Sequence, residues 1–133
     1  MTNPIILLAD NDAGAKPVFE AVKQATDIKP TGKEAHVHVG ANMYLVPIPT
    51  AESKSESMIE DLFDPSLLAA KVDGKSFHAA SKGFNKSIHY GKTVFAHKVV
   101  RANADSIDFS GFSSLLSNIS DVIAVHAKKA ESS

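Results

Sequence analysis

The chain is 133 residues long, the size of one domain with one modest hydrophobic core. Its hydrophobic content of 44% is ordinary for globular proteins, and no apolar run approaches the roughly 20 residues of a membrane-spanning helix. The absence of cysteine excludes disulfides, thiolate metal ligands and a cysteine nucleophile, and with no signal-peptide pattern it predicts a cytoplasmic protein without a membrane partner.

The net charge of −1 hides an uneven distribution along the chain. Residues 1–64 carry ten acidic residues and five lysines, whereas residues 75–101 carry five lysines, one arginine and no acidic residue. An acidic part followed by a basic part suits an enzyme that holds a metal ion and acts on a polyanion such as DNA or RNA. A solvated basic face explains the same composition equally well.

The first predicted element is a strand over residues 4–9, which form an unbroken apolar run. Apolar side chains on both faces favour a central strand of a helix-covered sheet. Asp10 and Asp12 follow at the carboxyl end, where such sheets bind ligands. Alternate residues point to one side, so the two carboxylates can converge on a hard cation, Mg²⁺ or Mn²⁺. The structural alternative is that Asp12 caps the next helix and Asp10 is a solvated strand end.

The segment from Leu7 to Lys16, Leu-Leu-Ala-Asp-Asn-Asp-Ala-Gly-Ala-Lys, resembles the Asp-x-Asp strand and turn of TOPRIM domains. These are the metal-binding folds of topoisomerases, primases and overcoming-lysogeny-defect (OLD) type nucleases. Within this family the segment is most similar to the TOPRIM-like C-terminal tail of some retron reverse transcriptases. The resemblance implies a single, partial TOPRIM-like domain over residues 1–130, an α/β sheet with flanking helices. It also implies a nuclease-like role in phage defence beside an upstream reverse-transcriptase chain.

Three further elements are predicted before residue 50. Proline in a first turn, followed by an apolar stripe, predicts a helix over residues 15–25. Alternation over residues 35–39 predicts a half-buried strand, and the apolar run of residues 43–48 predicts a second one. The Gly-Ala-Asn turn between them favours a hairpin or two neighbouring strands. His36 and His38 share one strand face, where exposed side chains are commoner than metal ligands.

Residues 57–64 contain two further acidic candidates. Ser57 and Glu60 have the spacing of a capping box, which by itself accounts for Glu60 but leaves Asp61 unexplained. The same stretch resembles the Glu-Asp segment of retron tails and OLD-type nucleases, where a carboxylate joins the metal cluster. The resemblance implies that Glu60 serves catalysis and that Asp61 is a metal ligand beside Asp10 and Asp12. A short helical turn is predicted over residues 65–72.

The next helix is predicted to open at Lys92 and to run to about residue 102. A lysine in the first turn opposes the helix dipole, which indicates another task for this side chain. The Tyr-Gly-Lys sequence of residues 90–92 again resembles the retron tails, and OLD-type nucleases use a lysine after their acidic cluster. The resemblance therefore implies a catalytic role for Lys92, with a solvated surface lysine as the alternative.

The basic region supplies the candidate contacts to nucleic acid. Basic and aromatic residues stand together at residues 75–77 and 82–86, a composition that suits loops touching backbone phosphates. The candidate nucleic-acid-binding residues are Lys75, Lys82, Lys86, Lys98 and Arg101. Farther along, a helical stripe over residues 112–126 predicts an amphipathic helix, and residues 131–133 are predicted to be a disordered tail.

Two functions from different classes follow. The first is a metal-dependent, nuclease-like domain that processes nucleic acid. The second is a non-catalytic remnant or interaction module. TOPRIM domains normally begin with an earlier strand that ends in a catalytic Glu, and no such strand precedes Pro4. Without it, the strand of residues 4–9 is expected to expose an edge that pairs with a partner chain or a second copy.

Overall fold

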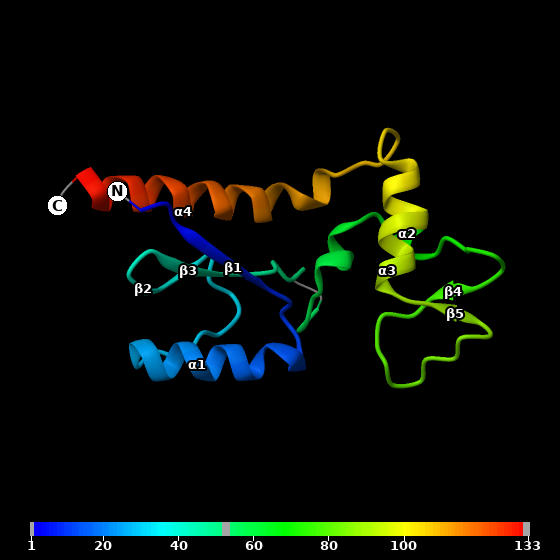
Figure 1. The fold of residues 1–133 in the computed structure, drawn as a ribbon, viewed down its shortest axis with the longest axis horizontal. Coiled ribbons are helices and arrows are strands. Elements are labelled where there is room, and N and C mark those ends of the chain that lie inside the picture. Colours follow the sequence, from blue (N-terminus) through cyan, green and yellow to red (C-terminus); the bar gives the residue numbers. More distant parts are fainter. Residues whose placement is uncertain (1, 52–53, 132–133) are drawn as a thin grey trace. The chain divides into compact units, whose positions relative to one another are not determined.

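The computed structural model describes residues 2–51 and 54–131 and shows a mixed α/β protein with helices and small sheets (Figure 1). It forms two compact units: the described residues up to Ile59 together with those from Phe112 onward, and Glu60–Gly111. The expectation of one domain over residues 1–130 stays a prediction. No helix in this described part combines the length and apolar character that crossing a membrane requires.

The first unit is built on a three-stranded sheet with the strand order β1-β3-β2. β1 (Ile5–Ala9) runs parallel to β3 (Met43–Pro47), and β2 (Val37–Gly40) pairs with β3 in the antiparallel sense. The predicted hairpin between the last two is confirmed. Ala41 occupies its turn with a positive φ of 47°.

The central strand of this sheet is β3, whose residues from Tyr44 onward are buried. β1, predicted to be central, lies at an edge instead, and its Ile5, Leu7 and Leu8 side chains are 47%, 40% and 47% exposed. An apolar run indicates which faces of a strand tend to be covered, but it carries no information about how many strands flank it. The position of β1 is therefore a correction to the sequence analysis.

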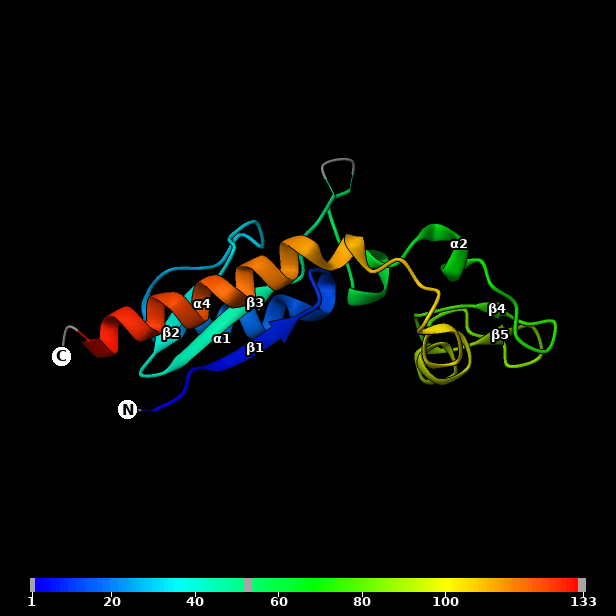
Figure 2. The ribbon, with the colours of Figure 1, turned by 90° about the horizontal axis from the view of Figure 1, so that it is seen from above.

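Two helices lie on opposite faces of this sheet (Figure 1), and the view from above shows both running alongside the strands (Figure 2). α1 (Lys16–Thr26) confirms the first predicted helix and ends where Asp27 adopts a left-handed φ of 62°. α4 (Ser113–Glu131) confirms the last one and includes Glu131 of the predicted tail, whose other two residues lie outside the described part.

The apolar stripe of α4 is narrower than its sequence suggests. Leu115 and Val122 are buried, whereas Leu116 and Ile123 are exposed. The polar end of the helix is fixed to the sheet by His126, whose ring nitrogens are hydrogen-bonded to the Tyr44 hydroxyl at 3.0 Å and to the Thr2 carbonyl at 2.8 Å. A sheet of three strands offers too narrow a surface to cover the whole stripe.

The second unit has its own small core. It contains α2 (Pro65–Leu68), the parallel pair β4 (Ser76–Phe77) and β5 (His89–Tyr90), and α3 (Lys92–Val94). Tyr90, Phe95 and Val99 are its buried residues, and Phe77 stacks on Phe95 with ring centroids 4.8 Å apart. The unit is thus held by aromatic packing around two short strands.

The helix predicted from Lys92 to about residue 102 is confirmed in extent but not in type. α3 provides a single α-helical turn, a π-helix follows over Phe95–Val100, and a 3₁₀ turn over Arg101–Asn103 completes the segment. Sequence periodicity does not distinguish these helix types, because all of them bury side chains three to five residues apart.

Candidate functional site

Asp10 and Asp12 follow β1 as expected, and each makes a structural hydrogen bond. Asp10 Oδ1 accepts a bond from the Ile59 backbone N–H at 2.9 Å. Asp12 Oδ1 accepts one from the Gly14 N–H at 2.9 Å and caps the 3₁₀ turn over Ala13–Ala15. Asp12 therefore caps a helical turn, but this is the short turn before α1, and α1 itself begins after Ala15 without a side-chain cap. A carboxylate oxygen can accept more than one interaction, so a hydrogen bond to the backbone does not by itself exclude cation binding.

Asn11, between the two carboxylates, ties three chain segments together and was not singled out from the sequence. Its Nδ2 lies within hydrogen-bonding distance of the Gly32 carbonyl at 2.6 Å, the Thr50 hydroxyl at 3.2 Å and the Ile48 carbonyl at 3.3 Å. Its backbone exchanges two hydrogen bonds with Ser57, at 2.6 and 2.8 Å. An amide at the end of an apolar strand is the only signal that the sequence offered for this role.

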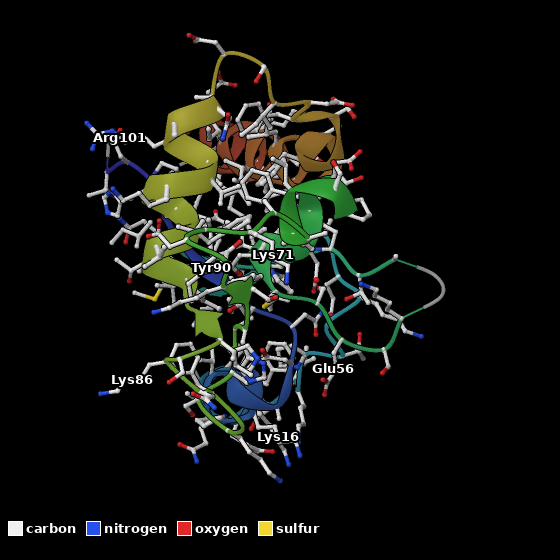
Figure 3. The ribbon with its side chains drawn as sticks, turned by 90° about the vertical axis from the view of Figure 1, so that its right-hand side faces the viewer. Lys16, Glu56, Lys71, Lys86, Tyr90 and Arg101 are labelled. Atoms are coloured by element: carbon white, nitrogen blue, oxygen red, sulfur yellow. The ribbon has the colours of Figure 1, made fainter. Side chains whose placement is uncertain are left out.

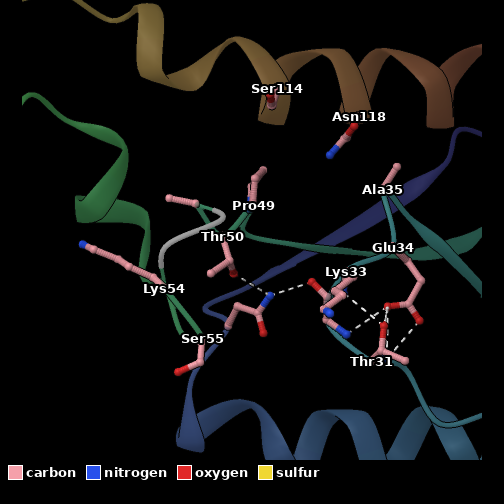
Figure 4. A pocket seen from close by; sticks show the side chains of 13 residues that line it. Thr31, Lys33, Glu34, Ala35, Pro49, Thr50, Lys54, Ser55, Ser114 and Asn118 are labelled. Atoms are coloured by element: carbon pink, nitrogen blue, oxygen red, sulfur yellow. Dashed lines mark hydrogen bonds between the residues drawn. The ribbon is translucent and has the colours of Figure 1, made fainter.

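A cavity of about 820 Å³, lined by both polar and apolar residues, opens beside Asn11 within the first unit. Figure 4 shows Ser114 and Asn118 of α4 on one side of it, and the Thr31 to Glu34 loop on another. Thr50, beyond the end of β3, also lines it. The cavity therefore lies beyond the carboxyl ends of the parallel strands β1 and β3, the place where ligands bind in open α/β sheets.

Glu34 organises one wall of this cavity. Its carboxylate accepts hydrogen bonds of 2.9–3.0 Å from the Thr31 N–H and hydroxyl and from the Gly32 N–H. Burial raises the pKa of Glu34, but the hydrogen bonds from Thr31 and Gly32 outweigh it and hold this pKa below its ordinary value. The loop is thus ordered around an ionised carboxylate.

We expect Glu34→Gln to lower the free energy of unfolding by about 1 kcal/mol at pH 7, because charge-assisted bonds become neutral ones. The folded-state pKa is depressed, so the stabilisation is complete above the unfolded-state pKa and disappears as pH falls through the folded-state value. Urea unfolding at pH 7 and pH 3 measures this difference. The exposed Glu56→Gln is the matched control, and an equal effect of Glu34→Gln at both pH values would contradict the prediction.

The second unit brings together the two predicted catalytic residues, Glu60 and Lys92. Glu60, in the 3₁₀ turn over Ile59–Leu62, is only 8% exposed, and its Oε2 lies 3.4 Å from Lys92 Nζ. That oxygen is buried and has no hydrogen-bond partner within the described part of the chain. Lys92 is the first residue of α3, so its unfavourable place on the helix dipole is offset by a nearby buried carboxylate.

The capping box predicted for Ser57 and Glu60 is wrong. The Ser57 hydroxyl donates to the Ile48 carbonyl at 3.1 Å, because the Ser57 backbone is paired with Asn11 beside the end of β3. Asp61 lies partly buried in the same 3₁₀ turn as Glu60. Asp10 and Asp12 belong to the first unit, and Glu60, Asp61 and Lys92 belong to the second.

The candidate metal ligands have suitable chemistry, since carboxylate oxygens are the donors that Mg²⁺ and Mn²⁺ prefer. Over residues 2–51 and 54–131, no group of three or more His, Asp or Glu side chains is arranged to hold a metal ion. The structure thus defines the surroundings of each carboxylate within its own unit, and a shared metal site stays a prediction.

The candidate nucleic-acid contacts all lie in the second unit. Figure 3 shows Lys86 and Arg101 extending outward on the same side of it, one from the loop before β5 and the other from the helical segment after α3. Lys75 is partly buried, and the other four side chains are exposed: Lys82, Lys86, Lys98 and Arg101. These four are therefore accessible to a polyanion.

Comparison with known proteins adds no assignment. No protein-family model matches the chain. No solved structure gives a significant match either. The TOPRIM resemblance therefore rests on the sequence segments quoted above.

Proposed function

We propose that this chain is a metal-dependent, nuclease-like domain that processes nucleic acid, of the TOPRIM-like kind found in retron reverse-transcriptase tails that serve phage defence. The observation that carries the proposal is the turn from Asp10 to Asp12, which places two carboxylates at the carboxyl end of a parallel strand, on either side of Asn11. Asn11, and neither carboxylate, lines the cavity. The pairing of Glu60 with Lys92 supports it.

Within this proposal Asp10 and Asp12 would hold Mg²⁺ or Mn²⁺, and Asp61 would serve as a further carboxylate ligand from its own unit; the ion, when bound, would supply a Lewis acid for the phosphodiester. Glu60 fixes the position of the Lys92 ammonium group by its charge. Lys92 neutralises negative charge that develops on the phosphate. The exposed basic residues of the second unit hold the nucleic-acid backbone, with a salt-sensitive affinity.

Asp10→Asn and Asp12→Asn are expected to weaken Mg²⁺ or Mn²⁺ binding by about tenfold or more, because each removes one anionic ligand from a hard-cation site. The fold should survive, since an Asn oxygen still accepts the bonds from Ile59 and Gly14. Calorimetry and thermal unfolding measure the two effects, with oligonucleotide cleavage as the activity assay.

Asp27→Asn is the matched control for this experiment. Asp27 is an exposed residue with a left-handed backbone that Asn also tolerates. It should change neither metal affinity nor stability. If the unmutated chain binds no metal at millimolar concentration, the metal-dependent function is refuted for this chain.

A second function, an interaction module that pairs with another chain, is favoured by the exposed β1 edge. Ile5, Leu7 and Leu8 leave a substantial apolar surface on an uncharged edge strand. Natural proteins usually protect such edges with charges, bulges or covering segments. We propose that a second copy of the chain or a reverse-transcriptase chain pairs with this strand.

A further inference from the structure

Three aromatic rings gather at the β4–β5 end of the second unit. His78, directly after β4, and His89, the first residue of β5, stack with centroids 4.5 Å apart and an interplanar angle of 15°. The Phe84 ring, from the connecting loop, lies 6.2 Å from the His78 ring and 5.9 Å from the His89 ring between centroids. We refer to His78, Phe84 and His89 as the ring cluster.

Hydrogen bonds fix the two histidine rings of the cluster. His78 Nε2 is hydrogen-bonded to the Lys82 carbonyl at 2.8 Å, and His89 Nδ1 accepts a bond from the Asn85 N–H at 3.0 Å. The His78 backbone N–H also donates to the Tyr90 carbonyl at 2.9 Å, which continues the pairing of the two strands. The rings are therefore held in place before any ligand arrives, which lowers the entropic cost of binding.

The ring cluster differs from the aromatic core of the same unit. Phe77 is committed to packing on Phe95, whereas Phe84 is 40% exposed. Lys82 and Lys86 flank Phe84 in the sequence, and both are exposed. The sequence between Gly74 and Ala104 contains no acidic residue. The cluster therefore presents flat rings inside a positively charged stretch of chain.

We propose that the ring cluster is a stacking platform for the bases of single-stranded nucleic acid. This inference rests on the proposed function, because it takes nucleic acid as the substrate. It restricts that substrate to single strands. Unpaired bases offer their faces to aromatic side chains, whereas bases inside a duplex are stacked on one another. Lys82 and Lys86 bind the phosphates on either side of the stacked base.

The absence of tryptophan from the chain makes a direct test available. Phe84→Trp places a single indole fluorophore in the cluster while keeping an aromatic face. We expect a thymidine oligonucleotide of about 15 nucleotides to quench this fluorescence on binding, with affinity equal to or above that of the unmutated chain. A hairpin duplex of the same length should bind more weakly and leave the fluorescence almost unchanged.

Two further variants separate stacking from charge. Phe84→Ala should weaken binding of the oligonucleotide by roughly 5-fold to 100-fold without changing the salt dependence, because no phosphate contact is lost. Lys82→Ala and Lys86→Ala should each weaken binding and flatten the salt slope by about 0.7. The control is Ile88→Ala, which removes an exposed apolar side chain, 56% exposed, from the same loop but outside the cluster.

Unchanged affinity in Phe84→Ala, equal binding of duplex and single strand, or no binding of either would overturn the platform. The first two outcomes concern the platform alone, whereas no binding of either nucleic acid would contradict the proposed function as well. Single-strand binding that depends on Phe84, without any metal-dependent cleavage, would contradict the nuclease and leave the platform standing. Metal-dependent cleavage that is insensitive to Phe84→Ala would contradict the platform and leave the nuclease function standing.

Discussion

Lys92→Met is expected to lower the free energy of unfolding by about 2 kcal/mol, because it removes the positive charge that lies beside the buried carboxylate of Glu60. Glu60 Oε2 is buried, and Lys92 Nζ is 3.4 Å away. Methionine keeps the apolar stem of the lysine and removes only its charge. Breaking a fully buried pair typically costs 3–5 kcal/mol. A smaller value is expected here because the two side chains are 41% and 11% exposed, which allows water to solvate the lysine.

The double variant Glu60→Gln/Lys92→Met tests this origin of the effect. The amide carries no charge, so the double variant should be more stable than Lys92→Met alone. Lys86→Met, at an exposed lysine, is the matched control and should change stability by less than about 0.5 kcal/mol. Urea unfolding of the four proteins measures all differences. Equal losses for Lys92→Met and Lys86→Met would contradict the prediction.

The three strands of the first unit and the main helices could be predicted because their signals are local, whereas the two-residue strands β4 and β5 were not predicted. Pro17 in the first turn of α1 and the alternation over β2 each reflect the conformational preference of a few neighbouring residues. The central position expected for β1 was wrong because strand order depends on long-range pairing. Only the structure shows that β3 lies between β1 and β2.

The sequence allowed single candidate residues of the site to be predicted, but not the contacts between them. The sequence identified Glu60 and Lys92 separately, yet nothing local states that the turn containing Glu60 lies against the start of α3. The Ser57 prediction failed for the same reason, because its partners, Asn11 and Ile48, come from other strand ends. Such contacts form only when the sheet is assembled, and a short motif does not encode them.

The exposed edge of β1 has a hydrogen-bonding pattern that suits a second copy. The Ile5 N–H donates to Asn42, and the Ala9 carbonyl accepts from Ile48. Because main-chain groups alternate in direction along a strand, those of Ile6 and Leu8 face the open edge. An antiparallel second copy would pair Ile6 with Leu8 of that copy, about a two-fold axis at Leu7.

Charge also favours this antiparallel arrangement over a parallel one. In the antiparallel register Asp10 lies opposite Pro4 of the second copy, and the two Asp10–Asp12 turns lie at opposite ends of the paired strands. A parallel pairing would place both acidic turns at the same end, where like charges repel. In the two-fold arrangement the open edge of each β1 strand is paired with that of the other copy. No open β1 edge is left for a third copy, so association stops at a dimer.

Leu7→Cys is therefore expected to convert most of the chain into a disulfide-linked dimer under mild oxidation. Residues on the two-fold axis form a non-hydrogen-bonded pair with Cα atoms about 4.5 Å apart, within the range that a disulfide spans. The chain has no other cysteine, so any cross-link reports on this position alone. A non-reducing gel and size-exclusion chromatography measure the product.

Ile5→Cys and Leu8→Lys complete the test of the register. Cysteine at residue 5 would lie opposite Ala9 of the second copy and should not cross-link to itself. Leu8→Lys, added to Leu7→Cys, places a charge on the open edge and should prevent the cross-link while leaving the β1–β3 pairing intact. Equal cross-linking at residues 5 and 7 would show a collision-driven reaction. A Leu7→Cys chain that stays monomeric at high concentration would refute pairing through this edge.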